Sequence, residues 1–269
     1  MQQTVPSGSP SDGTPCPPSP GPRAALFLDL DGTLIEIAPR PDAVVVPPHL
    51  PDLLARLSAG LEGAVAIVTG RGLDVARALA AGGLAATGPV PPIAFAAEHG
   101  TIIDASALAT RWPGATIPPM PPPPSPPPAW RAEAAAWAAA RPGLLLEEKA
   151  HGFVLHFRAA PALGEAATGF LQELVARPEA AGAFQVLPAH AAAELRPRSA
   201  DKGTAVTWLM RHPPFAGRVP VFIGDDVTDE YGIEACRALG GTGYRIPLSF
   251  PGPAAVHAWL GRLAAELPA

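Results

Sequence analysis

Carboxylates gather in two short runs of this 269-residue chain, and each run directly follows an apolar stretch. The stretches cover residues 24–28 and 219–223, and the runs supply five aspartates: Asp29, Asp31, Asp225, Asp226 and Asp229. Carboxylates placed just past the end of a buried strand repel one another and resist burial unless a cation lies among them. A hard divalent cation such as Mg²⁺ binds oxygen ligands and substrate phosphate. The two runs therefore predict a magnesium site.

The spacing of Asp29 and Asp31 suits nucleophilic and acid–base chemistry. In extended backbone, residues two apart point to the same side, so both carboxylates can face one reacting centre. One can attack phosphorus, and the other can carry the proton of the leaving group. Gly32 and Thr33 then allow a sharp exit from the strand. The sequence Asp-x-Asp-Gly-Thr after an apolar stretch thus predicts a reacting centre rather than a solvated turn.

Two further segments carry groups that can bind phosphate. Thr69 can donate its hydroxyl to a phosphate oxygen, and Gly70, which precedes Arg71, allows close approach of the backbone. Lys202 can hold a phosphate as a compact charge or neutralise a nearby aspartate. Each signal is weak alone, because a threonine there can equally cap a helix and a lysine at a helix start commonly lies in solvent. We therefore interpret them together with the aspartates.

The elements that must position these residues alternate between two kinds. The apolar stretches predict strands at residues 24–28, 64–68, 93–96 and 219–223. Helical patterns lie at residues 51–59, 74–81, 202–211 and 230–239. This order predicts an α/β fold, with a doubly wound parallel sheet and helices on both of its faces. Such sheets bind ligands at the carboxyl ends of their strands, which is where the polar residues lie.

The pattern becomes antiparallel after about residue 105 and returns to the parallel rhythm near the second acidic run. Helices are predicted at residues 129–140 and 162–176, and strands at 152–158, 183–187 and 191–195. This part therefore reads as an α+β insertion. The predicted organisation is a disordered proline-rich tail at 1–22, a core at 23–105 and 195–269, and the inserted domain at 106–194.

Composition and sequence pattern limit the kinds of partner and the cellular compartment that we expect for this protein. A net charge of −5 gives no electrostatic reason to expect nucleic acid or an anionic membrane as partner. No apolar run approaches the roughly 20 residues that span a bilayer. Cys16 lies in the proline-rich tail, so we expect no disulfide with Cys236, which we expect to pack in the core. With no secretory signal pattern at the start of the sequence, these features predict a cytoplasmic location.

Residues 118–128 form the strongest compositional feature, since nine of these eleven residues are proline. Such a segment cannot be a helix or a central strand, and we predict exposed polyproline II structure. A stiff surface connection and a binding site for a proline-reading partner are both compatible with it.

The motifs, taken in chain order, resemble those of the haloacid dehalogenase-like (HAD) phosphohydrolases. They are Asp-x-Asp-Gly-Thr at 29–33, then Thr69, then Lys202, then Gly-Asp-Asp-x-x-Asp at 224–229. The resemblance implies that Asp29 forms an aspartyl-phosphate and that Asp31 is the acid–base. It implies that Thr69 and Lys202 hold the transferring phosphoryl group. The insertion would be a cap domain that covers the site and supplies specificity.

The same resemblance implies a set of ligands for Mg²⁺. These are Asp29, the backbone carbonyl of Asp31, and Asp225, with Asp226 or Asp229 in support. A metal there would offset charge at the transition state, which is the main requirement of phosphoryl transfer.

Shorter matches resemble the trehalose-6-phosphate phosphatases within this superfamily, over about residues 24–260. They are Ala97-Glu98-His99-Gly100, Glu147-Glu148-Lys149, and Glu194-Leu195-Arg196-Pro197. The resemblance implies that Glu147, Lys149 and Glu194 contact sugar hydroxyls, to which carboxylates and an ammonium can hydrogen-bond. We also place Gly70 and Arg71 in the substrate site. His99 and His156 are given supporting roles, because the aspartate pair already supplies the nucleophile and the acid–base.

The implied reaction is Mg²⁺-dependent hydrolysis of trehalose 6-phosphate to trehalose and phosphate. One alternative is a capped phosphatase of another sugar phosphate, such as sucrose 6-phosphate, and a second is a non-catalytic regulatory subunit. The chain departs from the family's pattern at Thr69, where serine is commoner, and at Asp201, where small or polar residues are frequent. The proline segment also replaces an ordinary connection in the cap.

Overall fold

The computed structural model describes residues 16–38, 43–189 and 191–268. Residues 1–15 of the predicted tail lie outside the described residues. The described end of that tail runs beside the last helix, where Trp259 Nε1 donates to the carbonyl oxygen of Pro17 at 2.8 Å. Within the described ranges, no helix is long and apolar enough to cross a membrane.

A six-stranded sheet with the order β10-β9-β1-β2-β3-β4 forms the larger part of the molecule. Its strands are β1 (Ala24–Leu28), β2 (Val65–Val68), β3 (Ala94–Ala97), β4 (Ile102–Asp104), β9 (Val219–Gly224) and β10 (Thr242–Arg245). All neighbours pair in parallel except β4, which runs antiparallel to β3. Every residue of β1, β2 and β3 is buried, as expected of strands that are covered on both faces.

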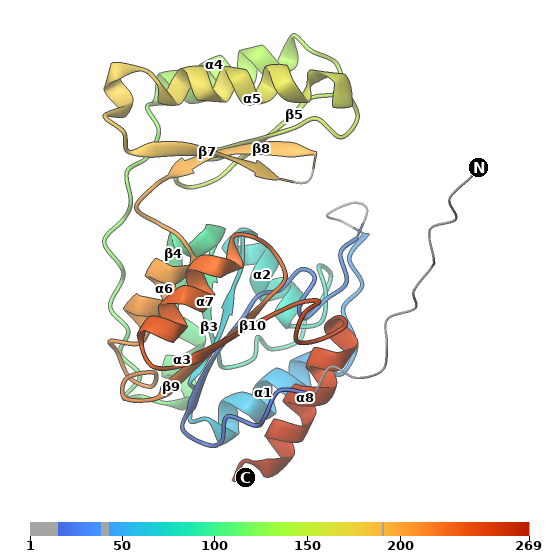
Figure 1. The fold of residues 1–269 in the computed structure, drawn as a ribbon, viewed down its shortest axis with the longest axis vertical. Helices are drawn as coiled ribbons and strands as arrows, with labels where there is room; N and C mark the ends of the chain where they lie inside the picture. Colours follow the sequence, from blue (N-terminus) through green and yellow to red (C-terminus); the bar gives the residue numbers. More distant parts are fainter. Residues whose placement is uncertain (1–15, 39–42, 190, 269) are drawn as a thin grey trace, which may run out of the picture.

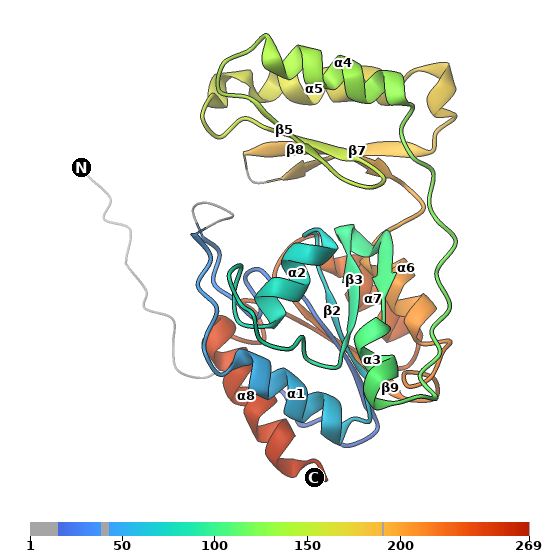
Figure 2. The same cartoon turned by 180° about the vertical axis from the view of Figure 1, so that it is seen from behind.

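Helices cover both faces of this sheet and confirm the doubly wound α/β fold. They are α1 (Leu50–Gly60), α2 (Leu73–Ala80), α3 (Ser106–Arg111), α6 (Lys202–Leu209), α7 (Asp229–Ala238) and α8 (Pro253–Glu266). Helix α6 packs beside α7 on one side of the sheet, and α1 packs beside α8 on the other (Figures 1 and 2). Cys236 of α7 is fully buried, as expected, and both cysteines are free thiols.

The middle of the chain builds a separate antiparallel sheet with the order β5-β6-β8-β7. Its strands are β5 (Leu145–Glu148), β6 (Phe153–His156), β7 (Phe184–Ala189) and β8 (Ala192–Pro197), and its helices are α4 (Pro128–Ala139) and α5 (Gly164–Val175). The two helices lie on the outer face of this sheet, and its other face looks toward the large sheet's carboxyl ends (Figure 1). Alternation along β8 therefore sends Leu195 into the small hydrophobic cluster and Glu194 toward the larger part of the molecule.

The limits of the inserted domain at residues 106 and 194 stay a prediction. Leu108 and Ala115 belong to the large hydrophobic cluster, while β8 continues to Pro197 within the small sheet. We call the small sheet with α4 and α5 the cap, and the large sheet with its helices the core.

The proline segment connects core to cap as an extended stretch (Figure 2). Pro123 and Pro126 are buried and Met120 is partly buried, while the residues between them are exposed. A burial period of three residues is that of polyproline II, which has three residues per turn. The carbonyl oxygen of Pro118 accepts from Trp208 Nε1 of the core at 3.1 Å.

Candidate active site

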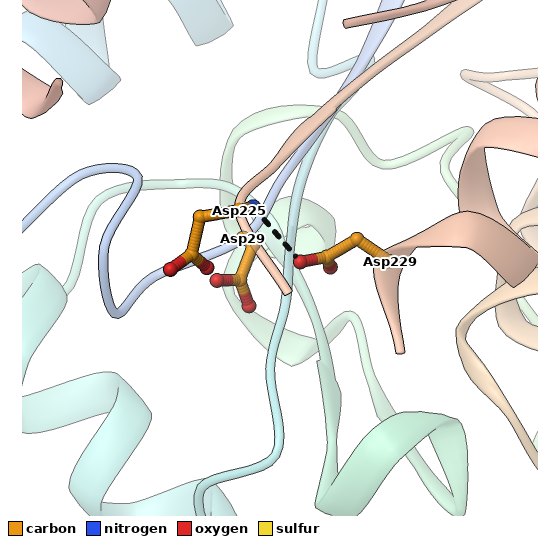
Figure 3. Close-up of side chains that lie close together, drawn as sticks. All are labelled: Asp29, Asp225 and Asp229. Atoms are coloured by element: carbon orange, nitrogen blue, oxygen red, sulfur yellow. Dashed lines mark hydrogen bonds between the residues drawn. The ribbon is translucent and has the colours of Figure 1, made fainter. Parts of the chain in front are cut away.

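The carboxyl ends of β1 and β9, which are neighbours in the sheet, bring the two acidic runs together. Asp29 follows β1, and its backbone N–H donates to the carbonyl oxygen of Ile223 at 2.9 Å. Asp225 follows β9, and Asp229 begins α7. Carboxylate oxygens of Asp29, Asp225 and Asp229 all lie within 4.8 Å of one another (Figure 3). Three aspartates from the two runs thus form one acidic cluster.

Lys202 is the cation of this cluster among the residues described. Its Nζ donates to Asp29 Oδ1 and to Asp229 Oδ1, both at 2.6 Å, and its side chain is only 3% exposed. The position of Lys202 is set by Asp201, whose Oδ1 accepts from Thr204 N at 2.7 Å and so caps α6 one residue before the lysine. The departure at Asp201 is therefore explained by a helix cap.

The electrostatics of the cluster show a deficit of positive charge. Burial raises the pKa of Asp29 well above its ordinary value, and repulsion by Asp229 adds to this despite Lys202. Burial, with repulsion by Asp229 and Asp226, raises the pKa of Asp225 to about 6. Burial opposes the charge of Lys202, but its two carboxylate partners raise its pKa above the ordinary value. With three carboxylates and one ammonium the cluster has excess negative charge, which a cation that prefers oxygen ligands can offset.

The donor set fits a divalent metal, with different roles for the three aspartates. Asp229 Oδ1 binds Lys202, and its Oδ2 accepts the backbone N–H groups of Asp225 and Asp226 at 3.0 and 2.9 Å. Asp229 therefore orients the second acidic run, while Asp29 and Asp225 are better placed as ligands. Gly32 makes room for Asp225, since a Cβ on Gly32 would lie 2.1 Å from Asp225 Oδ2.

The carboxylates of Asp226 and Asp31 make contacts outside the acidic cluster, although the ligand predicted for Asp31 is its backbone carbonyl and not its side chain. The carboxylate of Asp226 lies outside the three-residue cluster, and its Oδ1 accepts from the N–H of Val227 at 2.6 Å. Asp31 forms a two-bond ion pair with Arg71, in which Nε and Nη2 donate to its two carboxylate oxygens, each at 2.6 Å. The side chain of Arg71, predicted to bind substrate, thus holds the predicted acid–base.

The loop after β2 lies against this site. Thr69 is buried, and its Oγ1 accepts from the backbone N–H of Arg71 at 3.2 Å, which leaves the hydroxyl proton available to an oxygen of a ligand. The carbonyl oxygen of Gly70 accepts from Lys149 Nζ of the cap at 3.1 Å. The predicted phosphate-binding loop is therefore in direct contact with a predicted sugar-binding residue.

The cap residues Glu147, Lys149 and Glu194 lie on the same face of the small sheet. The register sets Glu147 opposite Val154 and Val154 opposite Glu194, so the side chains of these three residues form one row across β5, β6 and β8. Glu194 Oε1 accepts from Lys149 Nζ at 2.9 Å. Glu147 is set apart from this pair, because its Oε2 binds His156 Nε2 at 2.7 Å and its side chain is half exposed.

Two residues near Glu194 were only partly anticipated from the sequence. His99, expected in a supporting role, has its Nε2 3.1 Å from Glu194 Oε2. Arg196 is 2% exposed, and its guanidinium nitrogens have no hydrogen-bond partner in the described part of the chain. The signal for both was the pair of short motifs at residues 97–100 and 194–197, although neither motif indicates that they lie near each other.

The fold and the site together define a class. A doubly wound sheet that carries an Asp-x-Asp strand end, a buried lysine and a second acidic strand end, with an α+β cap above them, is a HAD-like phosphohydrolase. Comparison with known proteins agrees at the level of sequence. A family model described as Trehalose-phosphatase matches residues 27–248, and the chain belongs to that family. It is therefore a phosphatase.

Relatives extend over most of the chain. A protein of Sinorhizobium fredii named "Probable trehalose-phosphate phosphatase" is 37% identical over 222 residues, which cover 82% of this chain and 77% of that protein. The "Trehalose-6-phosphate phosphatase" of Escherichia coli is 33% identical over 233 residues, with the same shares covered. The C-terminal domain of the Candida albicans trehalose-6-phosphate phosphatase has a TM-score of 0.64 at 20% identity, covering 96% of this chain and all of that one. At this identity the likeness shows the fold alone.

Proposed function

We propose that this phosphatase hydrolyses trehalose 6-phosphate to trehalose and phosphate, with Mg²⁺ as cofactor and Asp29 as nucleophile. The observation that carries the proposal is the contact between Lys149 and Gly70, which joins the cap's Glu194–Lys149 pair to the loop of Thr69. A ligand bound there would meet hydroxyl-binding groups on one side and phosphate-binding groups on the other. That is the arrangement a sugar phosphate requires.

In the proposed reaction, an oxygen of Asp29 attacks phosphorus and the bond from phosphorus to the sugar oxygen breaks. Asp31 donates a proton to that oxygen, and trehalose leaves. Asp31 then takes a proton from water, whose oxygen attacks phosphorus while the bond from phosphorus to Asp29 breaks, and phosphate leaves with Asp29 restored as a carboxylate. Thr69 and Lys202 hold the phosphoryl oxygens throughout. A divalent metal held by Asp29, Asp225 and the backbone carbonyl of Asp31 would supply the positive charge that the phosphoryl group needs.

Arg71 has a place in this scheme that the sequence did not suggest. Its two hydrogen bonds occupy both carboxylate oxygens of Asp31, so they fix that group in place but must open before one oxygen can carry a proton to the sugar oxygen. We propose that Arg71 exchanges this contact for the substrate's polar groups as the substrate binds, which frees Asp31 to carry the proton.

A panel of sugar phosphates separates the proposed substrate from its rivals. Phosphate release is measured from trehalose 6-phosphate, sucrose 6-phosphate and glucose 6-phosphate, in Mg²⁺ and in chelator. We expect trehalose 6-phosphate to have the highest kcat/KM, by roughly a hundredfold, because a poorly matched sugar leaves buried polar groups unpaired. Chelator should abolish turnover. Preference for sucrose 6-phosphate would establish the first alternative, and no release from any substrate would favour the regulatory one.

Three further predictions go with this proposal. A proline-reading partner at residues 118–128 has support in the outward-facing prolines between Met120, Pro123 and Pro126. The cytoplasmic location and the lack of nucleic-acid or membrane partners rest on the sequence features given above and stay predictions.

A further inference from the structure

The carboxylate of Glu194 is bound from two sides, by one residue of the cap and one of the core. Lys149 Nζ lies 2.9 Å from Oε1, and His99 Nε2 lies 3.1 Å from Oε2. The Glu194 side chain is only 8% exposed, so these two partners fix both of its oxygens. His99 is therefore the core residue that sets where a carboxylate of the cap points.

The core holds His99 in place through its backbone. The N–H of His99 donates to the carbonyl oxygen of Thr69, and the N–H of Glu98 donates to that of Arg71, both at 2.9 Å. Glu98 and His99 both have left-handed backbone, with φ of 48° and 57°. Non-glycine residues seldom adopt this conformation, and where they do the strain commonly serves a site. The turn thus fastens His99 to the loop that we assign to phosphate binding.

The absence of a side chain at Gly70 makes room for the imidazole. A Cβ on Gly70 would lie 2.5 Å from Cε1 and 2.6 Å from Nε2 of His99. The ring therefore lies directly on the backbone of the Thr69 loop. The contact with Gly70 and the contact with Glu194 together set the orientation of the ring.

We propose that His99 is a positioning residue that aims the carboxylate of Glu194 at the sugar and so sets the preference for a disaccharide phosphate. The inference rests on the proposed function, because it assigns Glu194 to sugar binding. His99 acts through Glu194 and not as a proton carrier. Its Nε2 is occupied by that carboxylate, and its Nδ1 is buried with no hydrogen-bond partner among the described residues.

The protonation state fits this role. Burial lowers the pKa of His99 below its ordinary value, so the ring is neutral near pH 7 and carries its proton on Nε2, where Glu194 accepts it. Burial also disfavours the charge of Glu194, but contacts with His99 and Lys149 outweigh it and hold the pKa of that carboxyl well below its ordinary value. A neutral donor and a charged acceptor make a strong, directional hydrogen bond.

The test compares a sugar substrate with a small one in variants of the full chain. His99→Leu removes the donor at similar size, and His99→Gln retains an N–H donor. Kinetics are measured with trehalose 6-phosphate and with p-nitrophenyl phosphate, which has no sugar for Glu194 to bind. We expect His99→Leu to raise KM for trehalose 6-phosphate by about tenfold to a hundredfold, as loss of a hydrogen bond to a charged group predicts. The kcat/KM for p-nitrophenyl phosphate should change less than about twofold, and His99→Gln should recover most of the lost affinity.

The control is His212→Gln, three residues past the end of α6, where the imidazole hydrogen-bonds to the carbonyl oxygen of Trp208 and packs against the Trp208 ring. It should leave both activities unchanged. An equal loss on both substrates in His99→Leu, or no recovery in His99→Gln, would overturn the inference. A wild-type protein that hydrolyses p-nitrophenyl phosphate but not trehalose 6-phosphate would instead show that the proposed function is wrong.

Discussion

Single residues carry the chemistry of this site, and their partners decide what each can do. Asp29, Thr69, Lys202 and Asp225 were identified from motif order, and the structure places them around the ends of β1, β2 and β9 and the start of α6. The pairings could not be read from the sequence. The bond between Asp31 and Arg71 joins residues 40 positions apart, and the bond between Lys149 and Glu194 joins residues 45 apart. Such contacts depend on how the loops fold and not on local pattern.

Glu194 offers a test of the electrostatics at this scale. Its pKa in the folded protein lies below the ordinary value of 4.5, so the ionised carboxylate stabilises the fold at neutral pH. That contribution is present above the pKa of the unfolded chain and is lost as pH falls from about 5 toward the folded pKa. Glu194→Gln should therefore lower the free energy of unfolding at pH 7 by about 2 kcal/mol. The free energy of unfolding of this variant should also fall less steeply as the pH is lowered.

The measurement is urea unfolding at a series of pH values from 7 to 3. Glu165→Gln, which removes an exposed carboxylate of α5, serves as the matched control and should follow the wild type. If Glu194→Gln lost stability in acid as steeply as the wild type, Glu194 would not be the ionised, partnered group that the structure shows.

Helices and strands carry these residues to one place, and their starts and ends matter more than their interiors. Helix α6 begins at Lys202 because Asp201, in extended backbone, accepts from Thr204 N. A cap of this kind fixes the first turn, and the first turn holds the lysine that binds Asp29. The ammonium is therefore placed by a residue that does not touch the cluster.

Removal of the Asp201 side chain, which accepts from the first turn of α6, tests this dependence. Asp201→Ala should lower the free energy of unfolding by about 1 kcal/mol, since it leaves the N–H of Thr204 without its acceptor. The phosphatase kcat should fall as well, because the first turn of α6 no longer fixes the position of Lys202. Asp201→Asn keeps a side-chain acceptor and should stay close to the wild type in both measurements. Equal stability in all three proteins would mean that α6 is held by its packing alone.

Buried central strands were predictable, and most edge strands were not, although β7 at the edge of the small sheet was predicted at residues 183–187. Strands β1, β2, β3 and β9 were recognised because continuous apolar stretches indicate burial on both faces. Strands β4, β5 and β10 lie at sheet edges, are mostly partly or fully exposed, and have no such pattern. Helix α8 was also absent from the expected elements, although Val256, Trp259, Leu260 and Leu263 repeat at helical spacing and are buried.

The whole molecule joins two sheets that meet through a few polar contacts. Lys149 reaches Gly70, Glu194 reaches His99, and the N–H of Ala150 donates to Glu98 Oε2 at 2.9 Å. All three contacts converge on the loop after β2 and the turn after β3. The resemblance implied that the insertion covers the site. Which residues meet there depends on the placement of one sheet over the other, and local sequence contains no signal for that.

The most direct test of the account is phosphate release from trehalose 6-phosphate by the wild type and by Asp29→Asn. Both proteins are assayed at saturating substrate with and without Mg²⁺, and circular dichroism confirms that the variant is folded. The account predicts Mg²⁺-dependent release by the wild type and a loss of at least about a thousandfold in kcat for Asp29→Asn, which lacks the nucleophile. A folded Asp29→Asn protein that turned over at the wild-type rate, or a wild-type protein that released no phosphate, would contradict it.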